Sequence, residues 1–187
     1  MDKYIFKKSK ALDRKTCDHI INVFEKSNPE WEKTRKNYYL VIGKLDTIKF
    51  NFLLPILMKY LREYCSKHPF LYTRQSDFAL ENEFNIQKYL PGTCYEQHID
   101  NKKYDGHMEH GKNEWDCRRL LGWMIYLNDI KKDGGTYWPQ QRFTTKPRAG
   151  DLYIWPAGWT HSHYGIPAPQ ETKYIITGWC SFHGRRY

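Results

Sequence analysis

Two short histidine motifs in the second half of the sequence have the residue types of a metal site. They are His98-x-Asp100 and His161-x-His163. In an extended strand, residues two apart face the same side, so His98 and Asp100 present an imidazole and a carboxylate on one face. Either histidine of the second motif can complete a set of two histidines and one carboxylate. Such a facial set leaves coordination positions open and suits non-haem Fe(II), where a co-substrate and O₂ bind side by side.

A lysine further along the chain strengthens this interpretation, because a single His-x-Asp is common in proteins without a metal. Lys173, Ile175, Thr177 and Trp179 alternate onto one face of a predicted strand. This pattern buries an ammonium group near the second histidine motif, where an unpaired charge is costly. A bound carboxylate is the natural partner for Lys173.

Short strands are expected to position these residues. From about Phe78 the chain consists of runs rich in β-branched and aromatic residues, separated by turn residues such as Pro91-Gly92 and Gly134-Gly135. This pattern is typical of a β-sandwich or barrel. The predicted strands are Glu83–Tyr89, Tyr95–Asp100, Leu120–Leu127, Thr136–Trp138, Asp151–Trp155, His161–Tyr164 and Lys173–Phe182.

The first half is predicted to be mostly helical. Thr16 can cap a helix with apolar residues at helical spacing, and Asp46 or Thr47 can open another that continues through Tyr60 and Tyr64. We find no repeat and no Pro-, Gly- or Ser-rich linker, so we expect residues 1–187 to form one domain. Residues 1–78 would be helical support and residues 79–187 the β core.

Composition excludes several other classes of protein. Hydrophobic residues make up 40% of the 187 residues, which is a globular composition. The five cysteines form no close CxxC pair, so neither a disulfide scaffold nor a cysteine-rich zinc site is expected. The first ten residues lack the features of a signal peptide and no apolar run is long enough to span a membrane, so we expect a cytoplasmic protein without a membrane partner. The net charge of +9 leaves a nucleic-acid partner open, although the basic residues fall in short, separate clusters.

The motifs occur in an order that resembles a known family. They are Tyr89-Leu-Pro-Gly92, Tyr95-Glu-Gln-His98-Ile-Asp100, Ile125-Tyr-Leu-Asn128, Gly134-Gly135, Pro147-x-x-Gly150-Asp151, His163-x-x-x-Pro167, Lys173-Tyr174 and Thr177-x-Trp179. Together they resemble the prolyl-hydroxylase branch of the 2-oxoglutarate/Fe(II) oxygenases over roughly residues 83–182. The resemblance implies a double-stranded β-helix, a jelly roll of the cupin type, buttressed by helices.

The resemblance also implies a role for individual residues. His98, Asp100 and His163 would be the iron ligands. Lys173 would hold the distal carboxylate of 2-oxoglutarate, supported by Tyr126 and Thr177. Tyr89 and Trp179 would line the substrate pocket. The implied reaction consumes 2-oxoglutarate and O₂, yields succinate and CO₂, and hydroxylates a prolyl residue of a peptide or protein, with ascorbate as a candidate reductant.

Several alternatives stay open at this point. His161 competes with His163 as the distal ligand, although only His163 has the family's spacing to Pro167 and Lys173. Arg148 is a second candidate for the oxoglutarate carboxylate. The polar segment from Asn101 to Arg119 is either a solvated loop or a lid over the substrate.

Other residues and functions were also weighed. His107-x-x-His110 is a weak candidate for a separate metal site, since no third ligand is evident. Trp123, Trp138, Trp155 and Trp159 could form a stacking surface for a substrate, but at least half of them are expected to pack in the core. The rival functions are a nucleic-acid dealkylating oxygenase and a catalytically silent binding module.

Overall fold

The computed structural model describes residues 4–26, 32–33, 38–39, 51–73, 78–81, 84–101 and 118–182. Within these ranges the structure has the helices α1 (Arg14–Lys26), α2 (Leu53–Ser66) and α3 (Pro69–Thr73) and the 3₁₀ turn η3 (Trp159–His161). The strands are β1 (Phe6–Lys8), β2 (Glu32–Lys33), β3 (Tyr38–Tyr39), β4 (Phe78–Leu80), β5 (Asn85–Tyr89), β6 (Arg119–Tyr126), β7 (Thr136–Trp138), β8 (Phe143–Thr144), β9 (Leu152–Pro156), β10 (Tyr164–Gly165) and β11 (Lys173–Phe182).

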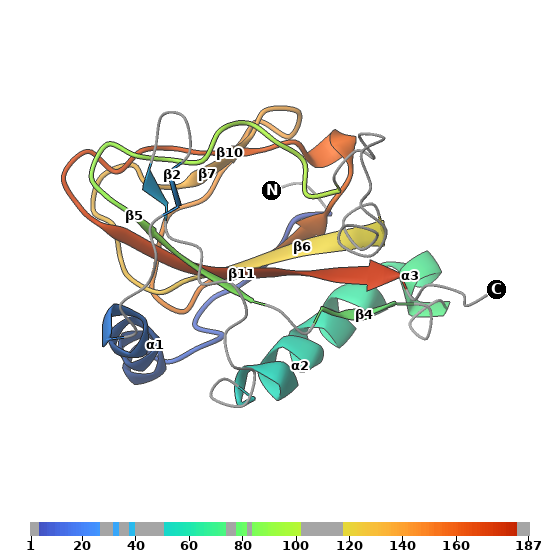
Figure 1. Ribbon diagram of the computed structural model, residues 1–187. Coiled ribbons are helices and arrows are strands. Elements are labelled where there is room, and N and C mark those ends of the chain that lie inside the picture. The colour runs from blue at the N-terminus through green and yellow to red at the C-terminus, as the bar shows by residue number, and fades with distance from the viewer. Residues whose placement is uncertain are drawn as a thin grey trace, which may run out of the picture.

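The strands form two antiparallel sheets. The larger sheet has the order β1-β9-β6-β11-β5-β3-β2, with β4 also paired to β11, and the smaller one has the order β10-β7-β8. In Figure 1 helices α1 and α2 lie on one side of the large sheet and the small sheet lies on the other. The fold is therefore mainly β with helical support, as predicted.

The central strands bury side chains on both faces. On β6, Trp123 and Ile125 belong to the core cluster that includes helix residues, whereas Met124 and Tyr126 belong to a second cluster. Strands β9 and β11 divide their side chains between the same two clusters. This explains why these strands read as nearly continuous apolar runs rather than as alternating ones. The second cluster also contains Trp138 of the small sheet, so it lies between the two sheets.

The helical support differs in detail from the prediction. Helix α1 buries Cys17, Ile20 and Phe24, which recur at helical spacing, but the prediction that Thr16 caps it was wrong. The carboxylate of Asp13, just before the helix, accepts a hydrogen bond from the Thr16 backbone N–H at 2.7 Å. Asp13 therefore supplies the cap, as expected for an acidic residue at a helix start.

The second helix, α2, begins at Leu53 and passes through Tyr60 and Tyr64, which are both buried. Asp46 and Thr47 lie outside the described residues. The first half also contains β1, which pairs with β9 and places Phe6 opposite Ile154. This strand was not predicted, because three residues with two lysines carry too little periodicity.

Most predicted strands are present within one or two residues, and two, Thr136–Trp138 and Lys173–Phe182, have the predicted bounds. The predicted strand Tyr95–Asp100 is a segment in which only His98 forms a bridge. The predicted strand His161–Tyr164 was wrong, because His161 ends η3 and β10 begins at Tyr164. Within the described ranges, no helix has the length and hydropathy needed to cross a membrane.

Candidate metal centre

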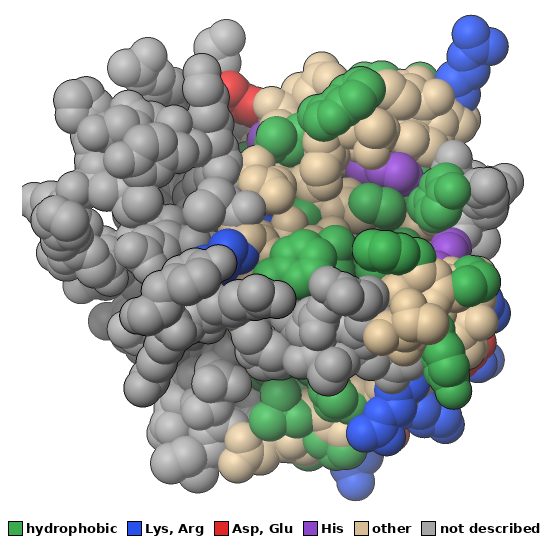
Figure 2. Space-filling view, turned by 90° about the vertical axis from the view of Figure 1, so that its right-hand side faces the viewer, with side chains coloured by type: hydrophobic (Ala, Val, Ile, Leu, Met, Phe, Trp, Pro, Cys, Tyr) green, Lys and Arg blue, Asp and Glu red, His purple; other side chains and the backbone are tan. Residues whose placement is uncertain are grey.

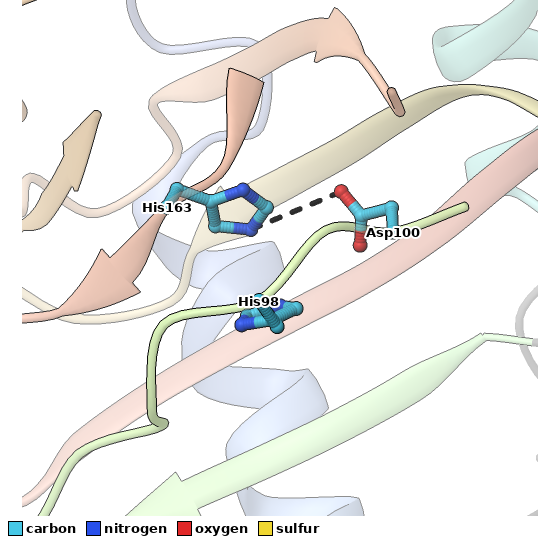
Figure 3. A group of neighbouring side chains, drawn as sticks. All are labelled: His98, Asp100 and His163. Atoms are coloured by element: carbon cyan, nitrogen blue, oxygen red, sulfur yellow. Dashed lines mark ion pairs between the residues drawn. The ribbon is translucent and has the colours of Figure 1, made fainter. Parts of the chain in front are cut away.

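Two backbone hydrogen bonds join the two histidine motifs, which are far apart in the sequence. His98 N–H donates to the His163 carbonyl at 3.0 Å, and His163 N–H donates to the His98 carbonyl at 2.9 Å. Residues directly opposite in an antiparallel pair project their side chains from the same face. Asp100, two residues after His98, shares that face. Figure 3 shows the three side chains directed toward a common point.

The ligand atoms are close enough to share one ion. Donor atoms of His98, Asp100 and His163 all lie within 4.8 Å of one another, and no other three His, Cys, Asp or Glu side chains of the described residues come together in this way. His163 Nε2 lies 3.8 Å from Asp100 Oδ2, which is too long for a hydrogen bond. One ion with bonds of about 2 Å can contact both atoms.

Backbone carbonyls orient both imidazoles. His98 Nδ1 lies 2.7 Å from the Glu96 carbonyl oxygen, and His163 Nδ1 lies 3.0 Å from that of His161. A carbonyl can only accept, so in each neutral ring Nδ1 carries the proton and Nε2 presents a lone pair. This is the tautomer that a histidine ligand requires. The donor set therefore fits a divalent metal such as Fe(II).

His161 does not join this group. It ends η3, where its Nδ1 lies 2.9 Å from Thr160 Oγ1 and its ring lies edge-on to Tyr4. The prediction that both histidines of the second motif share one face assumed a strand, and the 3₁₀ turn breaks that parity. His161 contributes to the site through its backbone carbonyl, which accepts a hydrogen bond from His163 Nδ1–H.

Two tryptophans hold the Asp100 carboxylate. Trp155 Nε1 donates to Oδ2 at 2.7 Å, and Trp179 Nε1 donates to Oδ1 at 2.8 Å. In the sheet register, Gly122 of β6 lies opposite Trp155 of β9 and also opposite Trp179 of β11. The three residues thus form one row across adjacent strands, with the glycine between the two indoles. Asp100 is buried, and each of its carboxylate oxygens accepts one indole N–H from this row.

Lys173 is buried without an acidic partner among the described residues. Its Nζ donates to the Gly134 carbonyl at 3.0 Å and lies 4.7 Å from the ring centroid of Tyr89. Burial lowers the pKa of Lys173 to about 8. A buried ammonium that shifts its pKa this far is stabilised by an incoming anion. A carboxylate of a bound ligand meets that requirement.

The other two predicted co-substrate residues, Tyr126 and Thr177, are buried and hydrogen-bonded within the protein. The Tyr126 hydroxyl contacts Thr136 Oγ1 at 3.0 Å and Thr145 Oγ1 at 2.6 Å, and burial raises its pKa, so it is a neutral hydrogen-bonding group. Thr177 Oγ1 donates to the Trp123 carbonyl at 2.7 Å, so its proton is already used. Tyr89, which was predicted to line the substrate pocket, is buried with its ring against the Lys173 ammonium.

The remaining candidates lie elsewhere. Arg148 is exposed, unlike the buried Lys173. Trp159 is 75% exposed, whereas Trp123, Trp138 and Trp155 are buried, so the core prediction holds for three of the four. The segment from Asn101 to Arg119 is described only at its ends, and His107 and His110 lie outside the described residues.

The roles of Trp155 and Gly122 were missed. Trp179 was expected to line a pocket, and Trp155 was assigned only to packing or stacking. The sequence did contain a signal that Trp179 lies near the site, because Trp179 shares its strand face with Lys173 and Thr177. The pairing of Gly122 with both tryptophans depends on the strand register, which cannot be read from local periodicity.

Comparison with protein families and curated proteins gives one consistent result. The sequence model of the 2OG-Fe(II) oxygenase superfamily matches residues 84–181. A "Putative prolyl 4-hydroxylase" of Acanthamoeba polyphaga mimivirus is 30% identical over 129 residues, which are 61% of this chain and 50% of that protein. Prolyl 4-hydroxylase subunit alpha-1 of Homo sapiens is 21% identical over 118 residues, which are 59% of this chain and 22% of that subunit. The chain thus spans half or less of these relatives.

Solved structures share the fold over nearly the whole chain. The viral collagen prolyl hydroxylase from Paramecium Bursaria Chlorella virus-1, solved with 2OG, superposes with a TM-score of 0.67 at 20% identity and covers 97% of both chains. A prolyl hydroxylase from Trichoplax adhaerens, in complex with a hypoxia inducible factor peptide, gives a TM-score of 0.64 at 16% identity and covers 96% of this chain and 84% of that one. The predicted double-stranded β-helix is confirmed.

Proposed function

The chain belongs to the 2OG-Fe(II) oxygenase superfamily, and on this basis we propose that it hydroxylates a prolyl residue of a peptide or protein. The reaction consumes 2-oxoglutarate and O₂ and releases succinate and CO₂, one oxygen atom entering the substrate and the other the succinate. The observation that carries this proposal is the convergence of the donor atoms of His98, Asp100 and His163 within 4.8 Å, with Nδ1 of each histidine directed at a backbone carbonyl.

Within this proposal the three residues bind Fe(II). When bound, the iron supplies the redox chemistry that couples oxidation of 2-oxoglutarate to hydroxylation of a C–H bond. The carboxylate of Asp100 offsets one of the two positive charges of the ion. His98 and His163 enter as neutral ligands, so the site retains positive charge for an anionic co-substrate.

Lys173 binds the distal carboxylate of 2-oxoglutarate in this scheme, and Tyr126 and Tyr89 line the same region. The ammonium of Lys173 is isolated from acidic side chains in the described part of the chain, so its charge is available to the ligand. Tyr126 remains protonated at neutral pH because burial raises its pKa. Thr177, whose proton is donated to a carbonyl, supports the strand rather than donating to the ligand.

The prime substrate is proposed from the relatives, since the matched curated proteins and the superposed structures are named as prolyl hydroxylases, one of them bound to a peptide. Figure 2 shows the end of the molecule at which η3 and α3 lie, where histidine side chains lie among hydrophobic ones. Ascorbate as reductant and a cytoplasmic location remain predictions from the sequence.

The nucleic-acid alternative rests on the net charge of +9. Several basic side chains are already neutralised within the chain, such as Lys7 by Asp151 at 2.8 Å and Arg14 by Asp129 at 2.7 Å. A phosphate track needs unneutralised Lys and Arg side chains along a groove. The silent binding module is disfavoured, because the three ligands and Lys173 are all in place.

The isolated ammonium of Lys173 predicts a pH dependence of co-substrate binding. Its pKa is about 8, below the usual 10.5, so it is mostly protonated at pH 7 and mostly neutral above pH 9. Because 2-oxoglutarate binds the protonated form, we expect its dissociation constant to rise as pH increases above about 8. Calorimetric titration of the Mn(II)-loaded protein from pH 6.5 to 9.5 measures this. A Lys173→Arg variant, which stays charged, should lose the dependence, and an equal dependence in both proteins would contradict the assignment.

Mass spectrometry of candidate substrates tests the proposed function. The protein is incubated with Fe(II), 2-oxoglutarate and O₂ together with proline-containing peptides, free amino acids or alkylated oligonucleotides. We expect peptides to gain one oxygen atom on proline, with stoichiometric succinate. Matched peptides with alanine in place of proline should stay unmodified. Loss of an alkyl group from a nucleobase, with all peptides unchanged, would instead support the dealkylating function.

A further inference from the structure

The carboxylate of Asp100 lies in a cradle formed by the row Trp155–Gly122–Trp179. Each oxygen accepts one indole N–H, at 2.7 Å from Trp155 and 2.8 Å from Trp179. A carboxylate oxygen has two lone pairs, so each retains one that a metal can use. The two bonds fix the plane of the carboxylate group and leave its free lone pairs in a defined direction.

The chemical type of these donors is significant. An indole N–H is a neutral donor, so it orients the carboxylate without cancelling its negative charge. A lysine or arginine at the same position would form an ion pair that competes with the metal. The cradle therefore holds Asp100 as a full anion for a cation to bind.

Packing fixes Trp155 and connects it to a second ligand. Trp155 is buried, and its ring lies edge-on to the imidazole of His163, with centroids 5.1 Å apart. It also packs against Trp138, at 5.3 Å. One indole thus contacts two of the three proposed ligands, Asp100 by a hydrogen bond and His163 by its ring.

Trp179 is held by a cation instead. The guanidinium carbon of Arg119 lies 3.6 Å from the centroid of the Trp179 ring, and Arg119 Nε is paired with Glu81 at 3.3 Å. A cation over an indole face is attracted to the ring, so Arg119 helps to keep the Trp179 ring in its orientation. Arg119 Nη1 also donates to the Asp100 carbonyl at 3.4 Å, so it anchors the ligand's backbone as well.

Gly122 provides the space for the carboxylate. A Cβ atom at this position would lie 2.5 Å from Asp100 Oδ2 and 2.8 Å from Trp155 Cε2, closer than real contacts allow. Any larger residue would therefore displace the ligand or one of its donors. The close approach of Asp100 to the sheet depends on the missing side chain.

We propose that Trp155 and Trp179 are positioning residues of the metal site, whose indole N–H groups orient the Asp100 carboxylate for metal binding in the space left by Gly122. The inference rests on the proposed function, because it takes His98, Asp100 and His163 as the ligands. Replacing a residue that orients a metal ligand typically lowers metal affinity 10- to 100-fold. We expect a loss of about this size for each tryptophan.

The test measures Co(II) binding to the whole protein by titration calorimetry and by the visible spectrum of the bound ion, without reference to turnover. Trp155→Phe and Trp179→Phe remove the N–H and keep an aromatic ring. Trp123→Phe is the matched control, because Trp123 is as buried as Trp155 and its Nε1 has no hydrogen-bond partner among the described residues. We expect roughly 10- to 100-fold weaker binding and an altered Co(II) spectrum for the first two variants, and binding within about twofold of wild type for the control.

A steric pair of variants gives an independent measurement. Gly122→Ala should weaken Co(II) binding at least as much as loss of one indole, because the new Cβ occupies the carboxylate's space. Gly158→Ala should have no effect, since a Cβ there meets no atom within 4 Å. Thermal unfolding of the metal-free proteins identifies any variant that is simply misfolded. The remaining variants then show whether the space left by Gly122 is needed for metal binding.

Each result is decisive. Wild-type Co(II) affinity and spectrum in both Trp155→Phe and Trp179→Phe, with no binding by His98→Ala, would overturn the inference and leave the proposed metal site standing. Failure of the wild-type protein to bind Co(II) would overturn the metal site itself. Weaker binding by the two tryptophan variants, with Trp123→Phe unchanged, would establish their role.

Discussion

Replacing His163 by alanine is expected to abolish Fe(II) binding and 2-oxoglutarate turnover, whereas replacing His161 is expected to leave both in place. His163 is paired with His98 through two backbone hydrogen bonds and lies 3.8 Å from the Asp100 carboxylate. Removal of a direct ligand should cost more than the 10- to 100-fold typical of residues that only orient one. The measurement is anaerobic titration of Fe(II) into each variant, followed by an assay for succinate.

His161→Ala is the matched control for this experiment. Its side chain packs near Tyr4 and Thr160, and the contribution it makes to the site comes from its backbone carbonyl, which alanine retains. His98→Ala and Asp100→Ala should behave like His163→Ala. Loss of iron binding in His161→Ala, with binding intact in His163→Ala, would show that the assignment of the distal ligand is reversed.

Lys173→Ala is expected to raise the 2-oxoglutarate requirement by a few hundredfold or more while iron stays bound. Lys173 is buried, and among the described residues no acidic side chain neutralises it, so its charge is available to the co-substrate. Removing one partner of a buried ion pair typically costs about 3–5 kcal/mol, which corresponds to this change in affinity. The measurement is the KM for 2-oxoglutarate, with the Fe(II) dissociation constant determined in parallel.

The control variant is Lys88→Ala, on the neighbouring strand β5. Lys88 forms an ion pair with Glu25 at 2.8 Å, so its charge is already neutralised within the protein. Its removal should leave the 2-oxoglutarate requirement unchanged. If Lys173→Ala had a normal requirement, another basic residue would bind the co-substrate, and Arg148→Ala would then be the variant to examine.

Local periodicity predicted the elements that position the site, because the signal lies within each strand. The bounds of β11 and β7 agree with the prediction, and β6 differs by one residue at each end. The His98-x-Asp100 parity also holds, since both side chains face the same point although this segment forms only a single bridge. These features depend on the two-residue repeat of extended backbone, which a sequence displays directly.

What could not be predicted depends on contacts between distant segments. The choice between His161 and His163 follows from the backbone pair with His98 and from η3, which breaks the expected strand. The cradle around Asp100 requires β9, β6 and β11 to be in one register, with Gly122 between two tryptophans. Neither arrangement has a local sequence period, and the family resemblance favoured His163 without explaining it. Likewise β1 is stabilised by pairing with β9 and not by its own composition.

The most direct test of the iron site is an anomalous difference map from a crystal grown anaerobically with Fe(II) and 2-oxoglutarate, measured at the iron absorption edge. The account predicts one strong peak about 2 Å from His98 Nε2, Asp100 and His163 Nε2, with the distal carboxylate of 2-oxoglutarate on Lys173 Nζ. A peak that is bound by His161 in place of His163, or that lies away from these three residues, would contradict it.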